Sequence, residues 1–175
     1  MIEAEVASPS SAQTEAEAFD ARVRPLLDSM LGYFARRVRP ADDAADCLSE
    51  ALTVLWRRRR EMPIADDELC AYAFGVAKGV LANQRRGQWR RAALQSRVRD
   101  HVMVQASSPS QPGDGDEVRA ALLQLSPEDR ELLTLIAWDG LTPAEAAVVM
   151  GVAPAAARKR LSRALARLRE ALQSP

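Results

Sequence analysis

Residues 126–172 have the sequence SPEDRELLTLIAWDGLTPAEAAVVMGVAPAAARKRLSRALARLREAL. This stretch opens with a helix start signal, because Ser126 is a favoured N-cap residue, Pro127 suits the first helical position, and two acidic residues follow in the first turn. Four large aliphatic residues between Leu132 and Ile136 then supply a buried face. Gly140 marks the end of this predicted helix.

A second start signal follows at once. Thr142 and Glu145 have the spacing of a capping box, in which each side chain satisfies a backbone N–H group that the helix leaves unpaired. This predicts a short helix over residues 143–150, and Gly151 then permits a tight turn. Pro154 opens one more helix. Two helices joined by such a turn are typical of a helix-turn-helix.

The last predicted helix carries the most concentrated positive charge. A helix-turn-helix places its second helix in the major groove of DNA, where early side chains meet base edges and flanking cations meet phosphates. A solvated basic face on an ordinary helical hairpin is the alternative, but the caps, the turn and the charge together favour DNA binding. About six phosphate contacts would give a log–log salt slope approaching about −5. The candidate DNA-binding side chains are Arg158, Lys159, Arg160, Arg163 and Arg167.

Upstream of this motif the chain divides into segments. Residues 107–116 contain two prolines and two glycines without a large apolar residue, which predicts a domain linker over residues 101–116. Residues 1–18 are acidic and poor in large apolar residues, which predicts a flexible tail. Two small folded units are therefore expected, one over residues 19–100 and one over residues 117–175.

The composition favours an all-α fold. In 175 residues, 47% are apolar and only 5% are aromatic, and Ala, Leu and Arg dominate, a mixture that suits helices rather than strands. The formal net charge is zero, but the charges are segregated: the first twenty residues hold no cation, whereas residues 85–99 hold six arginines and no acid. A polyanion is thus a candidate partner despite the neutral total.

The first folded unit shows three helical patterns. Apolar residues recur at helical spacing from Leu26 to Val38, and Pro40 closes that run. A second helix is expected from Asp42 and Asp43, with Ala44, Cys47, Leu48, Ala51 and Leu55 on its buried face. A third helix contains Tyr72 and Phe74 and continues into the arginine-rich stretch. Phe74 and Trp56 are expected in the core, whereas Trp89 could either pack or stack on unpaired bases.

The sequence contains no motif that indicates an enzyme. His101 is the only histidine, no glycine-rich phosphate loop is present, and the cysteines Cys47 and Cys70 lack metal-binding or disulfide spacing. We therefore expect no catalytic residue, no metal and no cofactor, with both thiols filling the core. Because no leader-like segment or membrane span is evident either, the sequence predicts a cytoplasmic protein.

Two stretches resemble one protein family. Residues 125–164 are similar to region 4 of extracytoplasmic-function (ECF) sigma factors of the sigma-70 family, the part that recognises the −35 promoter element. Residues 43–56 resemble the region 2 helix that docks on the β′ coiled coil of RNA polymerase, and residues 71–86 resemble the helix that melts and holds the −10 element. The two resemblances occur in the family's order, and their joint occurrence around a linker is more specific than a helix-turn-helix alone.

The resemblance implies a fold and a set of contacts. The fold would be two helical domains, a region 2 bundle and a region 4 helix-turn-helix, joined by the flexible linker. The partners would be core RNA polymerase, through its β′ coiled coil and β flap, and promoter DNA, with an anti-sigma factor as a further candidate. Polymerase contacts would fall on Asp43, Asp46, Ser49, Glu50 and Thr53, and contacts to −10 DNA on Tyr72, Lys78, Asn83, Arg85, Arg86, Trp89 and Arg90.

The sequence therefore predicts a sigma factor that directs promoter-specific initiation. One alternative is a stand-alone helix-turn-helix regulator whose first domain dimerises or senses a signal without contacting polymerase, and such a protein would bind palindromic half-sites. Another is a helical adaptor whose basic faces bind an acidic protein.

Overall fold

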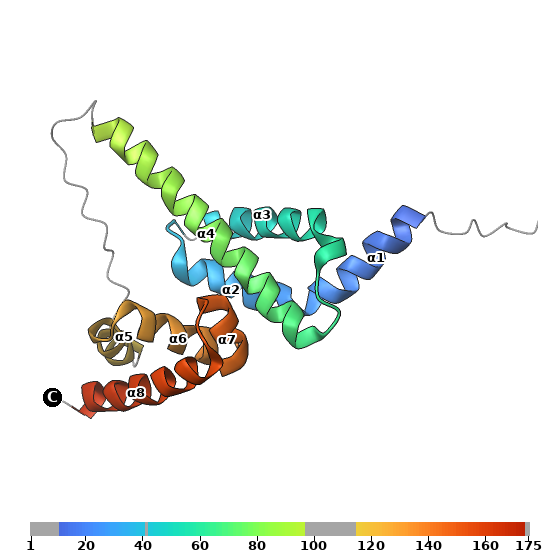
Figure 1. Cartoon of the computed structure of the whole chain (residues 1–175). Helices are drawn as coiled ribbons and strands as arrows, with labels where there is room; N and C mark the ends of the chain where they lie inside the picture. The colour runs from blue at the N-terminus through green and yellow to red at the C-terminus, as the bar shows by residue number, and fades with distance from the viewer. Residues whose placement is uncertain (1–10, 41, 97–114, 174–175) are drawn as a thin grey trace, which may run out of the picture.

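The computed structural model describes residues 11–40, 42–96 and 115–173, and these residues form α-helices, two short 3-10 helices and their connections without any strand. The predicted all-α fold is thereby confirmed. The long helix α4 (Asp66–Ser96) runs diagonally through Figure 1, with α2 and α3 packed against one part of it and the C-terminal helices lying below.

The N-terminal unit is built on α2 (Leu27–Arg37), α3 (Asp43–Arg57) and α4. Its centre is aromatic: Tyr33 meets Phe34 and Phe74 edge to face, with ring centroids 5.5 and 5.6 Å apart. Met30, Ala51 and Leu55 are completely buried around these rings. The sequence thus identified Phe74 and Cys47 of this core correctly, whereas Trp56, also expected there, is only half-buried and packs against Phe19.

The first helix was not predicted from the sequence. Helix α1 (Ser11–Val23) and the 3-10 turn η1 (Arg24–Leu26) begin inside the segment that we expected to be flexible through residue 18. Distant partners hold α1: Phe19 meets Trp56 edge to face at 5.1 Å, and Glu15 pairs with Arg59 at 2.9 Å. Arg59 lies in the 3-10 turn η2 (Arg59–Glu61) and stacks on the Trp56 ring. Composition alone could not show these contacts.

The C-terminal unit contains α5 (Gly115–Gln124), α6 (Pro127–Ala137), α7 (Pro143–Met150) and α8 (Pro154–Gln173). The predicted caps are confirmed. The Ser126 hydroxyl accepts a bond from the Asp129 N–H at 3.2 Å, and both bonds of the Thr142–Glu145 capping box form, at 2.6 and 3.2 Å. Gly151 ends α7 in the left-handed region with φ of 70°, which glycine adopts without steric cost.

The two units pack against each other. Helix α7 lies along α4, and the apolar core continues from the N-terminal unit into Leu132, Leu135 and Val149 of the C-terminal unit. Most of the predicted linker, residues 101–114, lies outside the described residues, whereas Gly115 and Asp116 already belong to α5. The junction thus places the helix-turn-helix, formed by α7 and α8, directly against α4.

Candidate functional site

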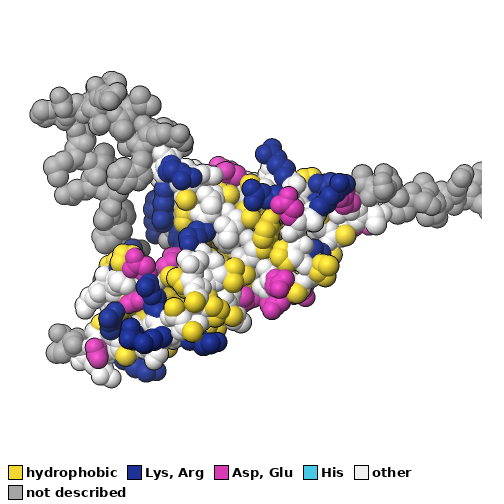
Figure 2. Space-filling model, in the orientation of Figure 1, with side chains coloured by type: hydrophobic (Ala, Val, Ile, Leu, Met, Phe, Trp, Pro, Cys, Tyr) yellow, Lys and Arg dark blue, Asp and Glu magenta, His cyan; other side chains and the backbone are white. Residues whose placement is uncertain are grey.

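The outer face of α8 is the first candidate surface. Ala157 and Ala164 are buried against the rest of the unit, so side chains near positions 159 and 163 point the opposite way. Arg158, Lys159 and Arg163 are exposed, and no ion pair holds them within the described part of the chain. Figure 2 shows Lys and Arg side chains gathered over α8 along the lower part of the molecule. This face can meet phosphates and base edges.

Two other predicted DNA contacts have an internal partner. The carboxylate of Asp129, a residue only 5% exposed, accepts a bond from Arg167 at 2.8 Å and lies 3.8 Å from Arg160. Sequence reasoning placed Asp129 only in the first turn of α6 and did not find this role. Because residues 160 and 167 are two turns apart, they share the side of α8 that faces α6. These arginines therefore fasten α8 to α6.

The second candidate surface is the acidic face of α3. Asp46 and Glu50 are exposed one turn apart, and no basic side chain lies within ion-pair distance of either among the described residues. The hydroxyls of Ser49 and Thr53 donate to carbonyls of their own helix at 2.9 Å. Asp43 differs, because it accepts a bond from Gln84 of α4 at 3.3 Å.

The acidic side chains of α3 also affect the pKa of Cys47, which is buried behind them. Burial raises the pKa of Cys47, and the charges of Glu50, Asp43 and Asp46 raise it further. The thiol is neutral and buried, so it fills space between the helices, as predicted. Asp46 and Glu50 have no ion-pair partner among the residues that the structure describes, so a basic protein surface could neutralise them.

The third candidate surface lies on α4, and α7 covers part of it. Lys78 donates to the backbone carbonyl of Val149 at 2.8 Å, so its side chain is held at the contact between α4 and α7. The Tyr72 hydroxyl is buried without a hydrogen-bond partner among the described atoms, at the edge of a groove of about 470 Å³ between α3 and α4. Exposed Val148 of α7 also lines this groove.

The remaining predicted −10 contacts lie further along α4. Asn83 accepts a bond from Arg86 one turn later, and Arg85 is exposed. Trp89 and Arg90 belong to the helix, but their side chains lie outside the described ones. The structure thus brings Tyr72 and Lys78 beside the helix-turn-helix and leaves Arg85 and Arg86 away from it.

A fourth feature was missed from the sequence. Asp139 is buried, and its carboxylate pairs with Arg36 and, at 3.0 Å, with Arg37, both from α2 of the other unit. Arg37 also lies over the Tyr33 ring at 3.9 Å and 3.3 Å from Glu131. The sequence carries no local signal for this cluster, because about a hundred residues separate the partners.

The described residues hold no group of three or more His, Cys, Asp or Glu side chains that could bind a metal ion. None of the described helices combines the length and the apolar character needed to cross a membrane.

Comparison with known proteins matches this chain to a family. Residues 115–168 match the family model "Sigma-70, region 4". Over 159 residues, the chain is 32% identical to an RNA polymerase sigma-E factor of Streptomyces avermitilis, covering 89% of this chain and 86% of the relative. It is 31% identical to the ECF RNA polymerase sigma factor SigF of Caulobacter vibrioides, covering 81% and 78% of the two chains.

Solved structures agree. The chain superposes on the sigma factor RpoE of Bartonella quintana, solved with the anti-sigma factor NepR, with a TM-score of 0.61 and 26% identity over 90% of this chain and 98% of the other. The fold also matches that of CnrH, solved with the cytosolic domain of CnrY, with a TM-score of 0.59 and 20% identity over 92% and 93% of the two chains.

Proposed function

The chain belongs to the ECF sigma factors of the sigma-70 family, and on that premise we propose which of its surfaces contact RNA polymerase and which contact the promoter. A protein of this family binds core RNA polymerase and directs promoter-specific initiation by recognising −10 and −35 elements. The polymerase supplies the catalysis, so we assign no catalytic residue and no cofactor to this chain. We also place it in the cytoplasm, where its polymerase partner works.

We propose that α3 docks on the polymerase through Asp46 and Glu50. The observation that carries this proposal is that the two carboxylates are exposed and have no ion-pair partner in the described part of the chain, on a helix that buries Ala44, Cys47, Ala51 and Leu55 on its other side. A basic surface of the polymerase, such as the β′ coiled coil, would give them the partners that they lack. Ser49 and Thr53 lie on the same face, whereas Asp43 serves mainly to join α3 to α4.

We propose that α8 recognises the −35 element through Arg158, Lys159 and Arg163. These side chains project from the first half of the second helix of a helix-turn-helix, which is the part that enters the major groove. Arg160 and Arg167 would act differently: by pairing with Asp129 they hold the angle between α8 and α6. They are positioning residues that can still lie near phosphates.

We propose that α4 binds the −10 element with Tyr72, Lys78 and the cations from Arg85 onward. Lys78 is bound to α7 in this arrangement, so the two units must separate before it can reach DNA. Once separated, the units would meet two promoter elements at a distance, and the tether between them would raise the effective concentration of the second contact. We further propose an anti-sigma factor as a partner, as in the Bartonella relative.

Co-elution with core RNA polymerase tests the docking surface. Wild-type protein should bind core enzyme at micromolar concentration, and the substitutions Asp46→Arg/Glu50→Arg should abolish this binding, because they place positive charge against a basic surface. The matched control is Glu17→Arg/Asp28→Arg, which makes the same charge change at exposed acids outside α3 and should bind normally.

The same experiment separates the sigma factor from a stand-alone regulator. Folded wild-type protein that fails to bind core enzyme, while binding palindromic DNA, would favour the regulator. Equal loss of binding in the α3 variant and in the control would contradict the docking face but not the function.

A further inference from the structure

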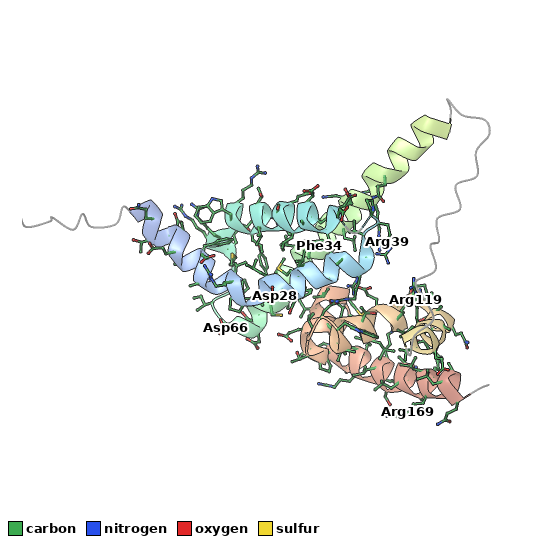
Figure 3. All side chains as sticks on the ribbon, turned by 180° about the vertical axis from the view of Figure 1, so that it is seen from behind. Asp28, Phe34, Arg39, Asp66, Arg119 and Arg169 are labelled. Atoms are coloured by element: carbon green, nitrogen blue, oxygen red, sulfur yellow. The ribbon has the colours of Figure 1, made fainter. Side chains whose placement is uncertain are left out.

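The junction between the two units encloses a cleft of about 930 Å³. Its walls come from α2, α4, α5 and α6, so each unit supplies one side. Figure 3 shows Arg39 and Arg119 on facing sides of this junction. The cations that line the cleft are Arg36, Arg37, Arg39, Arg85, Arg119 and Arg130.

Only part of this positive charge is neutralised. Arg36 and Arg37 pair with Asp139, and Arg37 also lies near Glu131, so among the described residues two carboxylates pair with the six guanidinium groups. In the same part of the chain, Arg39 and Arg130 donate to backbone carbonyls, which carry no net charge. A surplus of about four positive charges in one cleft is repulsive unless an anion enters it.

The cleft also offers an exposed aromatic ring. Trp138, at the C-cap of α6, lines the cleft and is 47% exposed, which is unusual for so large an apolar side chain. Indole rings stack on flat heterocycles, and nucleic-acid bases stack favourably on aromatic side chains. Arginine forks bind phosphate oxygens in pairs.

The volume of the cleft limits which phosphate-containing ligands can fit into it. The cleft volume falls within the range of about 300–1,000 Å³ that is typical of small-ligand sites. Duplex DNA, whose major groove alone is about 12 Å wide, is too large to be enclosed there. A small polyphosphate with a planar base matches both the charge and the ring.

We propose that this interdomain arginine cleft binds a nucleoside polyphosphate, with the phosphates between Arg39 and Arg119 and the base against Trp138. Because both units form the site, the ligand binds only while they are in contact, and it opposes their separation. Binding itself does not depend on the proposed function. The regulatory consequence, fewer molecules free to engage a promoter, does rest on it.

Isothermal titration of the full chain with GTP tests the proposal, in magnesium-free buffer without polymerase or DNA. The substitutions Arg39→Ala/Arg119→Ala, which spare the pairs with Asp139, should weaken GTP binding at least about tenfold, since they remove charge-assisted hydrogen bonds to the phosphates. The control Arg57→Ala/Arg169→Ala removes two exposed arginines outside the cleft and should leave the affinity unchanged. Urea midpoints verify that every variant is folded.

Further titrations fix the identity of the ligand. Trp138→Ala should weaken GTP but not tripolyphosphate, because only GTP carries a base to stack. Tripolyphosphate that binds as tightly as GTP, with no effect of Trp138→Ala, would overturn the assignment to a nucleotide. Absence of GTP binding, or an equal loss in the cleft and control variants, would overturn the site itself. A cleft variant that loses only affinity for a nonspecific duplex would instead assign the arginines to DNA.

Discussion

At the scale of single residues, charge alone does not tell which arginines of α8 meet DNA. Arg163 and Arg167 are both exposed to some degree and lie one turn apart, but Arg167 donates to a buried carboxylate whereas Arg163 has no ion-pair partner in the described part of the chain. The two residues therefore have separable roles. Their difference depends on Asp129, 38 residues away from Arg167.

Arg163→Ala should weaken binding to promoter duplexes and reduce the log–log salt slope by about one, because it removes one phosphate contact. It should leave the free energy of unfolding nearly unchanged, since an exposed side chain without a partner contributes little. Fluorescence anisotropy with a labelled −35 duplex at several salt concentrations measures the slope. An unaltered slope would remove Arg163 from the DNA-binding face.

Arg167→Ala should show the opposite pattern. It leaves the Asp129 carboxylate with only the more distant Arg160, so we expect the C-terminal unit to lose about 1–3 kcal/mol of stability. Urea denaturation followed by circular dichroism measures this loss, and Arg163→Ala is the matched control. Equal stability of the two variants would show that the Asp129 pair is not structural.

At the scale of elements, α7 is the helix of the C-terminal unit that is least stable in isolation. It has only eight residues, too few to be stable alone, so its caps and its burial decide whether it forms. The capping box fixes its start, Gly151 fixes its end, and Ala146, Ala147 and Val149 bury its inner face. Because α7 sets the position of α8, its first turn also bears on DNA binding.

Thr142→Ala should therefore destabilise the C-terminal unit by about 1 kcal/mol, the usual effect of removing an N-cap side chain. Thr142→Ser keeps the hydroxyl that accepts the Glu145 N–H bond and should restore most of the stability. Thermal unfolding of both variants measures this difference in stability. Two variants with the same midpoint would mean that the cap contributes nothing measurable.

Local signals explain why the elements were predictable and the contacts between them were not. Caps, prolines and apolar spacing lie within one or two turns, so the helix-turn-helix and the aromatic core followed from the sequence. Helix α1 did not, because its partners Trp56 and Arg59 are more than thirty residues away. The ion pairs of Asp129 and Asp139 were missed for the same reason, since only the fold brings their arginines to them.

At the scale of the whole molecule, the contact between the two units was not predicted. The sequence analysis expected two independent domains joined by a flexible linker. Apolar contacts join α4 to α7, and polar contacts reinforce them: Asp139 with Arg36 and Arg37, and Lys78 with the Val149 carbonyl. The same contacts cover part of the surface that we assign to the −10 element. On the proposed assignment of α4 to the −10 element, promoter engagement and the closed junction are competing states of one chain.

The reactivity of the Cys70 thiol can show whether the two units are in contact. It lies on α4 facing Glu145 of α7, and burial together with the neighbouring carboxylate raises the pKa of its thiol to about 11. Since only the thiolate reacts, alkylation at pH 8 is slow while the junction is closed. Separation of the units would remove Glu145 and return the pKa toward its usual value, and each unit of pKa restores about tenfold in thiolate.

In a Cys47→Ala background, which leaves Cys70 as the only cysteine, we expect iodoacetamide to react at least about tenfold faster when the protein is bound to core polymerase and promoter DNA. Free protein carrying Arg36→Ala/Arg37→Ala should also react faster, because the buried Asp139 then opposes closure. The control Arg57→Ala/Arg58→Ala removes an adjacent pair of exposed arginines that form no ion pair among the described residues, and it should react at the wild-type rate. A rate that stays low both in the promoter complex and in the Arg36/Arg37 variant would mean that the units remain in contact during initiation, and that Lys78 does not reach the −10 DNA.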